Sequence, residues 1–144
     1  MTNTLTTILH RASVPVPDET IADLIVPILT GPQRQGDVGI FPRPPLGAAE
    51  RSTMKALPTD GVAVVSGEAT GNTHILMSEA GCEALWAPAT PTDGDVVLGV
   101  LEVPAGGAVW LAHTDEHGAN GIGPGCYTLR GKREMAEEIR RVAD

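Results

Sequence analysis

The amino-acid sequence predicts a mainly β fold, a small antiparallel barrel or sandwich with an N-terminal and a C-terminal flanking helix. Between residues 35 and 131, short runs rich in Val, Ile and Leu alternate with turns made of Gly, Pro, Asp and Asn. Aromatic residues make up only 3% of the chain, so the core must be aliphatic. The two terminal segments instead place apolar residues at helical spacing.

Six runs are expected to be strands, because each is apolar or alternating and is bounded by turn residues. They are Asp37–Phe41, Gly61–Ser66, Thr73–Ser78, Asp95–Val103, Ala108–His113 and Cys126–Arg130. The Pro-containing segment Arg43–Met54, between the first two runs, predicts an ordered loop or a mobile excursion.

Two helices are expected at the ends of the chain. In residues 18–30, an apolar stripe follows acidic residues; it consists of Ile21, Leu24, Ile25 and Ile28. Gly31 and Pro32 should end this helix. Residues 132–143 repeat the pattern near the C-terminus. With 144 residues, one domain is expected. Residues 1–33 are predicted to be an extension with a short helix, and residues 34–144 a single β-rich domain that ends in a helix.

The charge distribution narrows the range of partners. The formal net charge is −8, and residues 56–129 contain no Lys or Arg. Such a stretch attracts cations and repels phosphates, so nucleic acid is not an expected partner. No apolar run approaches the ~20 residues of a membrane-spanning helix. The first residues lack the pattern of a secretory signal, so none is expected. We expect a cytoplasmic, soluble protein in which Cys82 and Cys126 are free thiols.

The residues with metal chemistry are three histidines and one carboxylate. They are His74, His113, Glu116 and His117. In an extended strand, His113 points to the same side as Val109 and Leu111. Neutral imidazoles around an open position are typical of catalytic zinc and of non-haem iron, so we predict a divalent metal, Zn or Fe, at this cluster.

Other assignments of these residues remain open. Asp115 could replace a ligand, and Cys126 could be a soft ligand. Alternatively, His113 is a hydrogen-bonded wall residue, His117 belongs to a turn, and His74 is exposed. The sequence does not decide between the metal site and this ordinary structural role.

Two further features of the sequence argue against a phosphate-binding loop and against nucleophilic catalysis. The glycine-rich Gly121–Gly125 lacks a Lys and a following helix, and Pro124 removes an amide donor that a phosphate site needs. A turn that leads into the next strand is the expected role. No serine lies in a Gly-x-Ser-x-Gly motif, and neither cysteine adjoins a histidine. The sequence therefore predicts no cofactor-binding residue besides the metal ligands, and it leaves open whether the protein is an enzyme.

A series of short motifs resembles a group of small, uncharacterised bacterial and phage proteins. The motifs are Arg34-Gln35-Gly36-Asp37-Val38, Glu68-Ala69-Thr70-Gly71-Asn72-Thr73-His74, Asp115-Glu116-His117-Gly118, Pro124-Gly125-Cys126-Tyr127 and Lys132-Arg133-Glu134. The group is similar in having QGDV, E-x-TGHxH, HEEH and PPGxY motifs, with QREY at the end. Asn72 stands at its first central histidine, and HEEH aligns with Thr114–His117, so His113 is displaced by one position. The resemblance implies a domain boundary near Arg34 and a site at His74 and His117.

The expected function is binding of a metal or a small ligand at the His/Glu cluster, with a metal-dependent activity left open. The alternative is a non-catalytic interaction or assembly module of a bacterial or phage system, in which the site is vestigial. Such a module would associate with itself or with a protein partner. Trp110 and Trp86 carry the largest apolar side chains, and we expect them to be buried or covered by the terminal helices.

Overall fold

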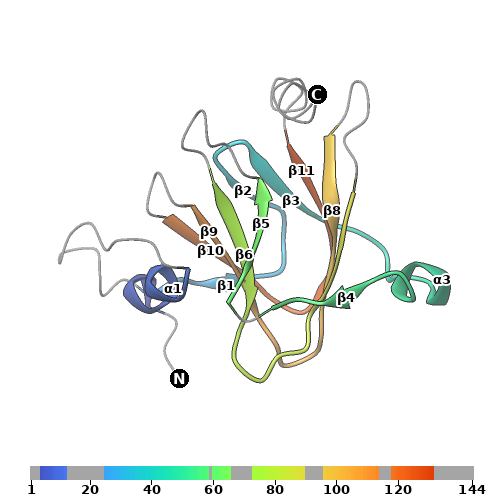
Figure 1. Cartoon of the computed structure of the whole chain (residues 1–144), viewed down its shortest axis with the longest axis horizontal. Helices are drawn as coiled ribbons and strands as arrows, with labels where there is room; N and C mark the ends of the chain where they lie inside the picture. The colour runs from blue at the N-terminus through green and yellow to red at the C-terminus, as the bar shows by residue number, and fades with distance from the viewer. Residues whose placement is uncertain are drawn as a thin grey trace.

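The computed structural model describes residues 4–12, 25–58, 60–65, 73–89, 96–113 and 118–131. Within these residues the chain forms two β-sheets that face each other, with short helices at their periphery (Figure 1). The predicted mainly β class is confirmed. The choice between a barrel and a sandwich stays a prediction.

One sheet has five strands within the described residues, in the order β1-β10-β9-β6-β5. Its strands are β1 (Ile28–Leu29), β5 (Val62–Val65), β6 (His74–Ser78), β9 (Val109–His113) and β10 (Gly118–Ile122). The pairs are antiparallel except that β1 runs parallel to β10.

The other sheet has six strands within the same residues, in the order β2-β3-β11-β8-β7-β4, and all its pairs are antiparallel. Its strands are β2 (Gln33–Gln35), β3 (Val38–Pro42), β4 (Lys55–Ala56), β7 (Leu85–Pro88), β8 (Val96–Val103) and β11 (Gly125–Gly131). The β8–β11 register shifts between Leu129 and Arg130, as at a β-bulge.

The main hydrophobic core lies between the two sheets. Residues at alternate positions point into it, as the two-residue period of a strand requires. In β8 the register shift interrupts this alternation, so that both Leu98 and Leu101 belong to the core. The five-stranded sheet contributes Leu76, Val109, Leu111 and Ile122, and the six-stranded sheet contributes Val38, Ile40, Trp86, Leu98, Leu101, Val103, Tyr127 and Leu129. The core is therefore mostly aliphatic, as the composition predicts.

Helix α1 (Leu5–Arg11) packs on the opposite face of the five-stranded sheet (Figure 1). Thr4 caps it, because its hydroxyl oxygen accepts from the backbone N–H of Thr7 at 3.3 Å. Ile8 and Leu9 of α1 share a second apolar cluster with Trp110, which is 0% exposed. The indole N–H of Trp110 donates to Glu79 Oε2 at 2.6 Å. The predicted burial of Trp110 and Trp86 is confirmed.

The predicted helix over residues 18–30 is wrong where the structure describes it. Ile25 forms a β-bridge with Thr4, and Ile28–Leu29 is strand β1. Pro27 lacks the N–H that a helix needs, whereas a short edge strand tolerates it. Residues 18–24 lie outside the described residues, as does the predicted helix 132–143. The helix found near the N-terminus is α1, earlier in the chain.

Gly121 explains why β1 can pair with β10. A Cβ at this residue would collide with the Pro27 carbonyl oxygen and would lie 2.9 Å from the Trp110 ring. Glycine therefore allows two strands and an indole to meet at one point. The predicted turn at Gly121–Gly125 is accordingly only partly right, because Gly121 and Ile122 belong to β10.

The six predicted strands are confirmed as β3, β5, β6, β8, β9 and β11, with ends that differ by at most one residue. The predicted loop 43–54 contains one turn of helix, α3 (Ala48–Arg51). Among the helices of the described ranges, none has the length and apolar character required to cross a membrane.

Candidate functional site

His74 and His113 lie side by side at one end of the space between the sheets. The register of β6 and β9 places His74 directly opposite His113, and both side chains are buried, at 1% and 2% exposure. Leu76 and Leu111 of the same strands belong to the core between the sheets. The predicted inward direction of both histidines follows from the two-residue period and agrees with their burial. The alternative in which His74 is exposed is wrong.

The two imidazole rings are stacked, with centroids 4.2 Å apart and planes inclined by 8°. A metal binds an imidazole nitrogen in the plane of the ring. Two nearly parallel planes share no point close to both rings. In this conformation, one ion therefore cannot bind both His74 and His113, and a shared ion would require one ring to rotate.

The β2–β3 hairpin covers the edge of the stacked pair. Gly36 turns the chain with φ +55°, a conformation that favours glycine. A Cβ on Gly36 would lie 3.5 Å from His74 Cε1, 3.7 Å from His113 Cε1 and 3.9 Å from His74 Nε2. Glycine thus leaves the approach to Nε2 of His74 clear of a side chain.

A chain of amide side chains joins β2 to β10 and ends at His74. Gln33 Nε2 donates to the Gly121 carbonyl oxygen at 2.9 Å, and Asn120 Nδ2 donates to Gln33 Oε1 at 3.1 Å. Gln35 Nε2 donates to Asn120 Oδ1 at 2.9 Å and to the Leu111 carbonyl oxygen at 2.7 Å. These bonds connect the edge of the six-stranded sheet to the five-stranded sheet.

The direction of every bond in this chain is fixed by its ends. A backbone carbonyl only accepts, so the groups that face Gly121 and Leu111 must be the NH₂ groups of Gln33 and Gln35. Oε1 of Gln35 is then left to face Nδ1 of His74, at 2.9 Å. Because an amide oxygen has no proton to donate, Nδ1 must carry the hydrogen. Neutral His74 is therefore protonated at Nδ1, and its Nε2 presents a lone pair.

The surroundings keep His74 neutral at physiological pH. Its pKa is lowered to about 4, first because burial disfavours the charged ring and second because of the neighbouring His113, while the carboxylate of Asp37 acts in the opposite direction. A ring that stays unprotonated offers Nε2 to a metal or to a hydrogen-bond donor.

The structure locates only part of the predicted ligand set. Glu116, His117 and Asp115 lie outside the described residues. Cys126 is on β11 between Gly125 and the inward-facing Tyr127, so it points to the outer face of the six-stranded sheet and away from His74. The idea that Cys126 serves this site is therefore wrong. Within the described part of the chain, no three His, Cys, Asp or Glu side chains form a metal-binding group.

The amide chain that orients His74 is not evident from the sequence. Neither β2 nor β10 is predicted as a strand, so the sequence pattern does not single out Gln33, Gln35 and Asn120 as site residues. One signal was present, since Gln33 and Gln35 are two residues apart and therefore share a face of any strand that contains them. Their partner Asn120 is 85 residues away from Gln35 along the chain, and no local pattern joins them.

The family model described as a domain of unknown function (DUF8820) matches residues 34–132. The chain belongs to this family. The matched range contains both sheets apart from β1 and the first residue of β2. It includes His74, His113, Gln35 and Asn120, whereas Gln33 lies one residue before it. No curated protein and no solved structure matches the chain.

Proposed function

We propose that this domain binds a divalent transition metal, Zn²⁺ or Fe²⁺, with Nε2 of His74 as one ligand. The observation that carries this proposal is the hydrogen bond between Nδ1 of His74 and Oε1 of Gln35. Metal-binding histidines usually donate their other ring N–H to an oxygen, which fixes the tautomer and directs the free nitrogen at the ion. The lowered pKa supports the same role, since only a deprotonated nitrogen binds a metal.

The remaining ligands are proposed from the sequence next to the stacked pair. Glu116 and His117 follow His113 by three and four residues, and both are suitable zinc or iron ligands. The carboxylate of Asp37 is near enough to His74 to influence its pKa and is a further candidate. We propose a different role for His113, in which it packs against His74 and helps to keep that ring neutral, and the stacking of the two rings supports this role.

The test is calorimetric titration of Zn²⁺ into protein purified without a histidine tag, together with elemental analysis of that protein. His74→Asn is the informative variant, because an Asn amide can still donate to Gln35 Oε1 while Nε2 is removed. His10→Asn is the matched control, since His10 is an exposed histidine on α1. We expect His74→Asn to weaken Zn²⁺ binding at least about 100-fold and His10→Asn to leave it unchanged.

Two more variants test the ligands expected from residues 116 and 117. Glu116→Gln and His117→Ala should each weaken Zn²⁺ binding, and His117→Ala should abolish the rise in melting temperature that added Zn²⁺ produces. If wild type and His74→Asn bind Zn²⁺ equally, or if neither binds it, the metal proposal is wrong.

A second candidate function, an assembly module, rests on a separate observation. Ile25, Ile28 and Leu29 are 63%, 41% and 48% exposed, and they lie within one short segment at the edge of the five-stranded sheet. Apolar side chains grouped at a sheet edge favour pairing with another chain. Self-association that is lost in Ile25→Ser/Leu29→Ser, measured by light scattering, would support this function, and a monomer at all concentrations would argue against it.

A further inference from the structure

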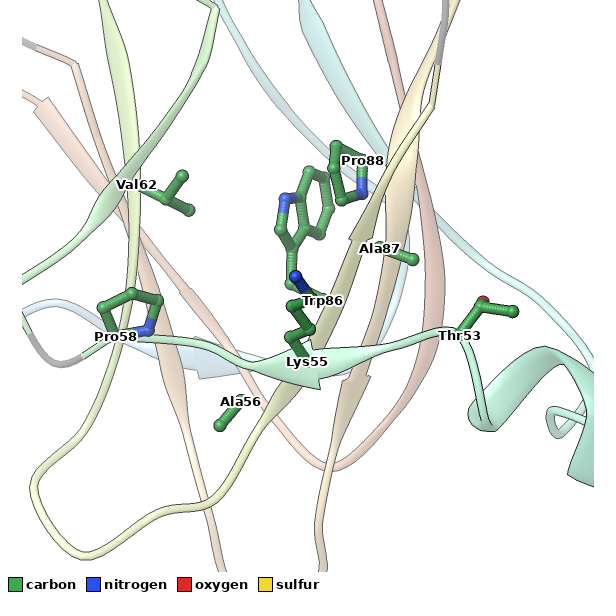
Figure 2. A pocket seen from close by; sticks show the side chains of 8 residues that line it. All are labelled: Thr53, Lys55, Ala56, Pro58, Val62, Trp86, Ala87 and Pro88. Atoms are coloured by element: carbon green, nitrogen blue, oxygen red, sulfur yellow. The ribbon is translucent and has the colours of Figure 1, made fainter.

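On the side of the core away from β2 and β10, the two sheets part and leave a groove. It lies between β5, at one edge of the five-stranded sheet, and β4 and β7 of the six-stranded sheet (Figure 2). Its volume is about 510 Å³, within the range of small-molecule sites. The lining residues are Thr53, Lys55, Ala56, Pro58, Val62, Trp86, Ala87 and Pro88.

Trp86 supplies the groove with a hydrogen-bond donor. Its side chain is 7% exposed, and its ring lies against the backbone of Gly99, where a Cβ would collide with it. Figure 2 shows the indole nitrogen on the side of the ring that faces Val62 across the groove. Within the described residues, no hydrogen-bond partner is found for this N–H. The indole nitrogen is not fully buried, so its N–H is accessible from the groove to an acceptor on a ligand.

Lys55 supplies a positive charge beside that donor. It is directly opposite Trp86 in the β4–β7 register, so the two side chains share a face. The next inward residue of the same segment, Leu57, belongs to the core, which confirms that this face points between the sheets. Lys55 is the only charged residue among those lining the groove, and none of the ion pairs of the described ranges involves it.

We propose that this groove binds a small amphipathic carboxylate, an organic acid with an apolar body. The apolar walls formed by Val62, Pro58 and the Trp86 ring would hold the body. The Trp86 N–H and the Lys55 ammonium would together hold the carboxylate, because both are donors and one carries the complementary charge. This site is separate from the proposed metal site and does not depend on it.

The experiment is a titration of the protein with octanoate, followed by the indole N–H cross-peaks in a ¹H–¹⁵N NMR spectrum. The chain has two tryptophans, so Trp110 is an internal control, its N–H being already donated to Glu79. Trp86→Phe assigns the two cross-peaks by removing one of them. We expect octanoate to shift the Trp86 cross-peak in a saturable manner and to leave the Trp110 cross-peak in place.

Two variants and one analogue test the role of the charge. Lys55→Met should weaken octanoate binding about tenfold or more, which corresponds to about 1.4 kcal/mol or more. Arg34→Met is the matched control, because it removes an exposed cation from β2, the opposite edge of the same sheet, and it should leave binding unchanged. Octanol, which has the same apolar chain without the charge, should bind more weakly than octanoate.

Three results would overturn the proposal. The first is a Trp86 cross-peak that does not move at millimolar octanoate. The second is equal binding of octanol and octanoate. The third is unchanged octanoate binding in Lys55→Met together with increased self-association. In that case the role of Lys55 would be to prevent the edge strand β4 from pairing with another chain.

Discussion

The polar groups on the two sides of the space between the sheets differ in their hydrogen bonding. Where β2 meets β10, the donors and acceptors of Gln33, Gln35 and Asn120 bond to one another, to backbone carbonyls and to His74. Where β5 parts from β4, the donors of Trp86 and Lys55 face a groove. A satisfied network fixes one geometry, whereas donors left open in an apolar setting are available to a ligand.

The two tryptophans show the same difference at single residues. Both side chains are buried, Trp110 at 0% exposure and Trp86 at 7%. Trp110 lies under α1 and donates its N–H to Glu79, which also forms an ion pair with Arg11 at 3.6 Å. Trp86 has no such partner within the described residues. Burial alone therefore does not separate a structural tryptophan from one that lines a site, and the hydrogen bonds do.

The largest expected effect is on stability, from truncation of the structural tryptophan. Trp110→Ala should lower the free energy of unfolding by about 3–5 kcal/mol, because it empties the cluster between α1 and the sheet. Trp86→Ala should cost at least about 1 kcal/mol less, because one side of its ring already borders a groove. Urea denaturation measures both values. Equal losses would mean that the groove side is packed as tightly as the α1 side.

The next effect is a loss of stability at acid pH that depends on His74. Its pKa of about 4 is below the ordinary 6.5, so the unfolded chain takes up the proton first as the pH falls. The neutral ring therefore contributes stability above pH 6.5, and this contribution disappears as the pH falls toward about 4. At about 1.4 kcal/mol per pKa unit, the loss is about 3 kcal/mol.

Urea denaturation at several pH values, from neutral to about 4, tests this effect. His74→Asn has no ring to titrate, so its stability should fall less steeply over that interval than the wild-type stability. His10→Asn controls for histidine content and should behave as wild type. Parallel curves for wild type and His74→Asn would show that His74 is as easily protonated in the fold as in the unfolded chain.

A smaller loss is expected from breaking the amide chain at its centre. Gln35→Leu should cost about 1–3 kcal/mol, because it leaves polar groups of the buried network unsatisfied. Gln33→Leu should cost less, since Gln33 is only half-buried and its partners can bond to water instead.

¹⁵N NMR of the His74 ring, without added metal, should show the proton on Nδ1 in wild type. A proton on Nε2 in wild type would refute the assigned bond directions.

The fold was predictable from the sequence where the pattern is local. β6, β8 and β9 are apolar runs bounded by turns, and their place and inward faces were predicted. The sequence pattern does not reveal β1, β2, β4 and β7, because they are two to four residues long and form only against partners far along the chain. It does not reveal β10 either, because two of the five residues of β10 are glycines. At Ile28, helical spacing of apolar residues was outweighed by Pro27 and by the close approach that Gly121 permits.

The candidate site was predictable in position but not in detail. The two-residue period was enough to turn His74 and His113 to one face. Their stacking depends on the register between β6 and β9, which no local pattern specifies. The orientation of His74 depends on Gln35, which is 39 residues away from it. The groove beside Trp86 depends on how far two sheet edges lie apart, and this is a property of the packed fold.

The smallest expected effect on the free energy of unfolding is at Lys55, on the side of the core that borders the groove. Lys55→Met removes a charge that makes no ion pair within the described residues, so the free energy of unfolding should change by no more than about 0.5 kcal/mol. Arg34→Met should behave alike, since both are exposed residues on edge strands of one sheet. Gln35→Leu, which removes a donor from the amide chain between β2 and β10, should cost several times more in the same urea experiment. If Lys55→Met cost as much as Gln35→Leu, the Lys55 ammonium would stabilise the fold through bonds of its own. The contrast between the hydrogen-bonded side, where β2 meets β10, and the groove side would then not hold.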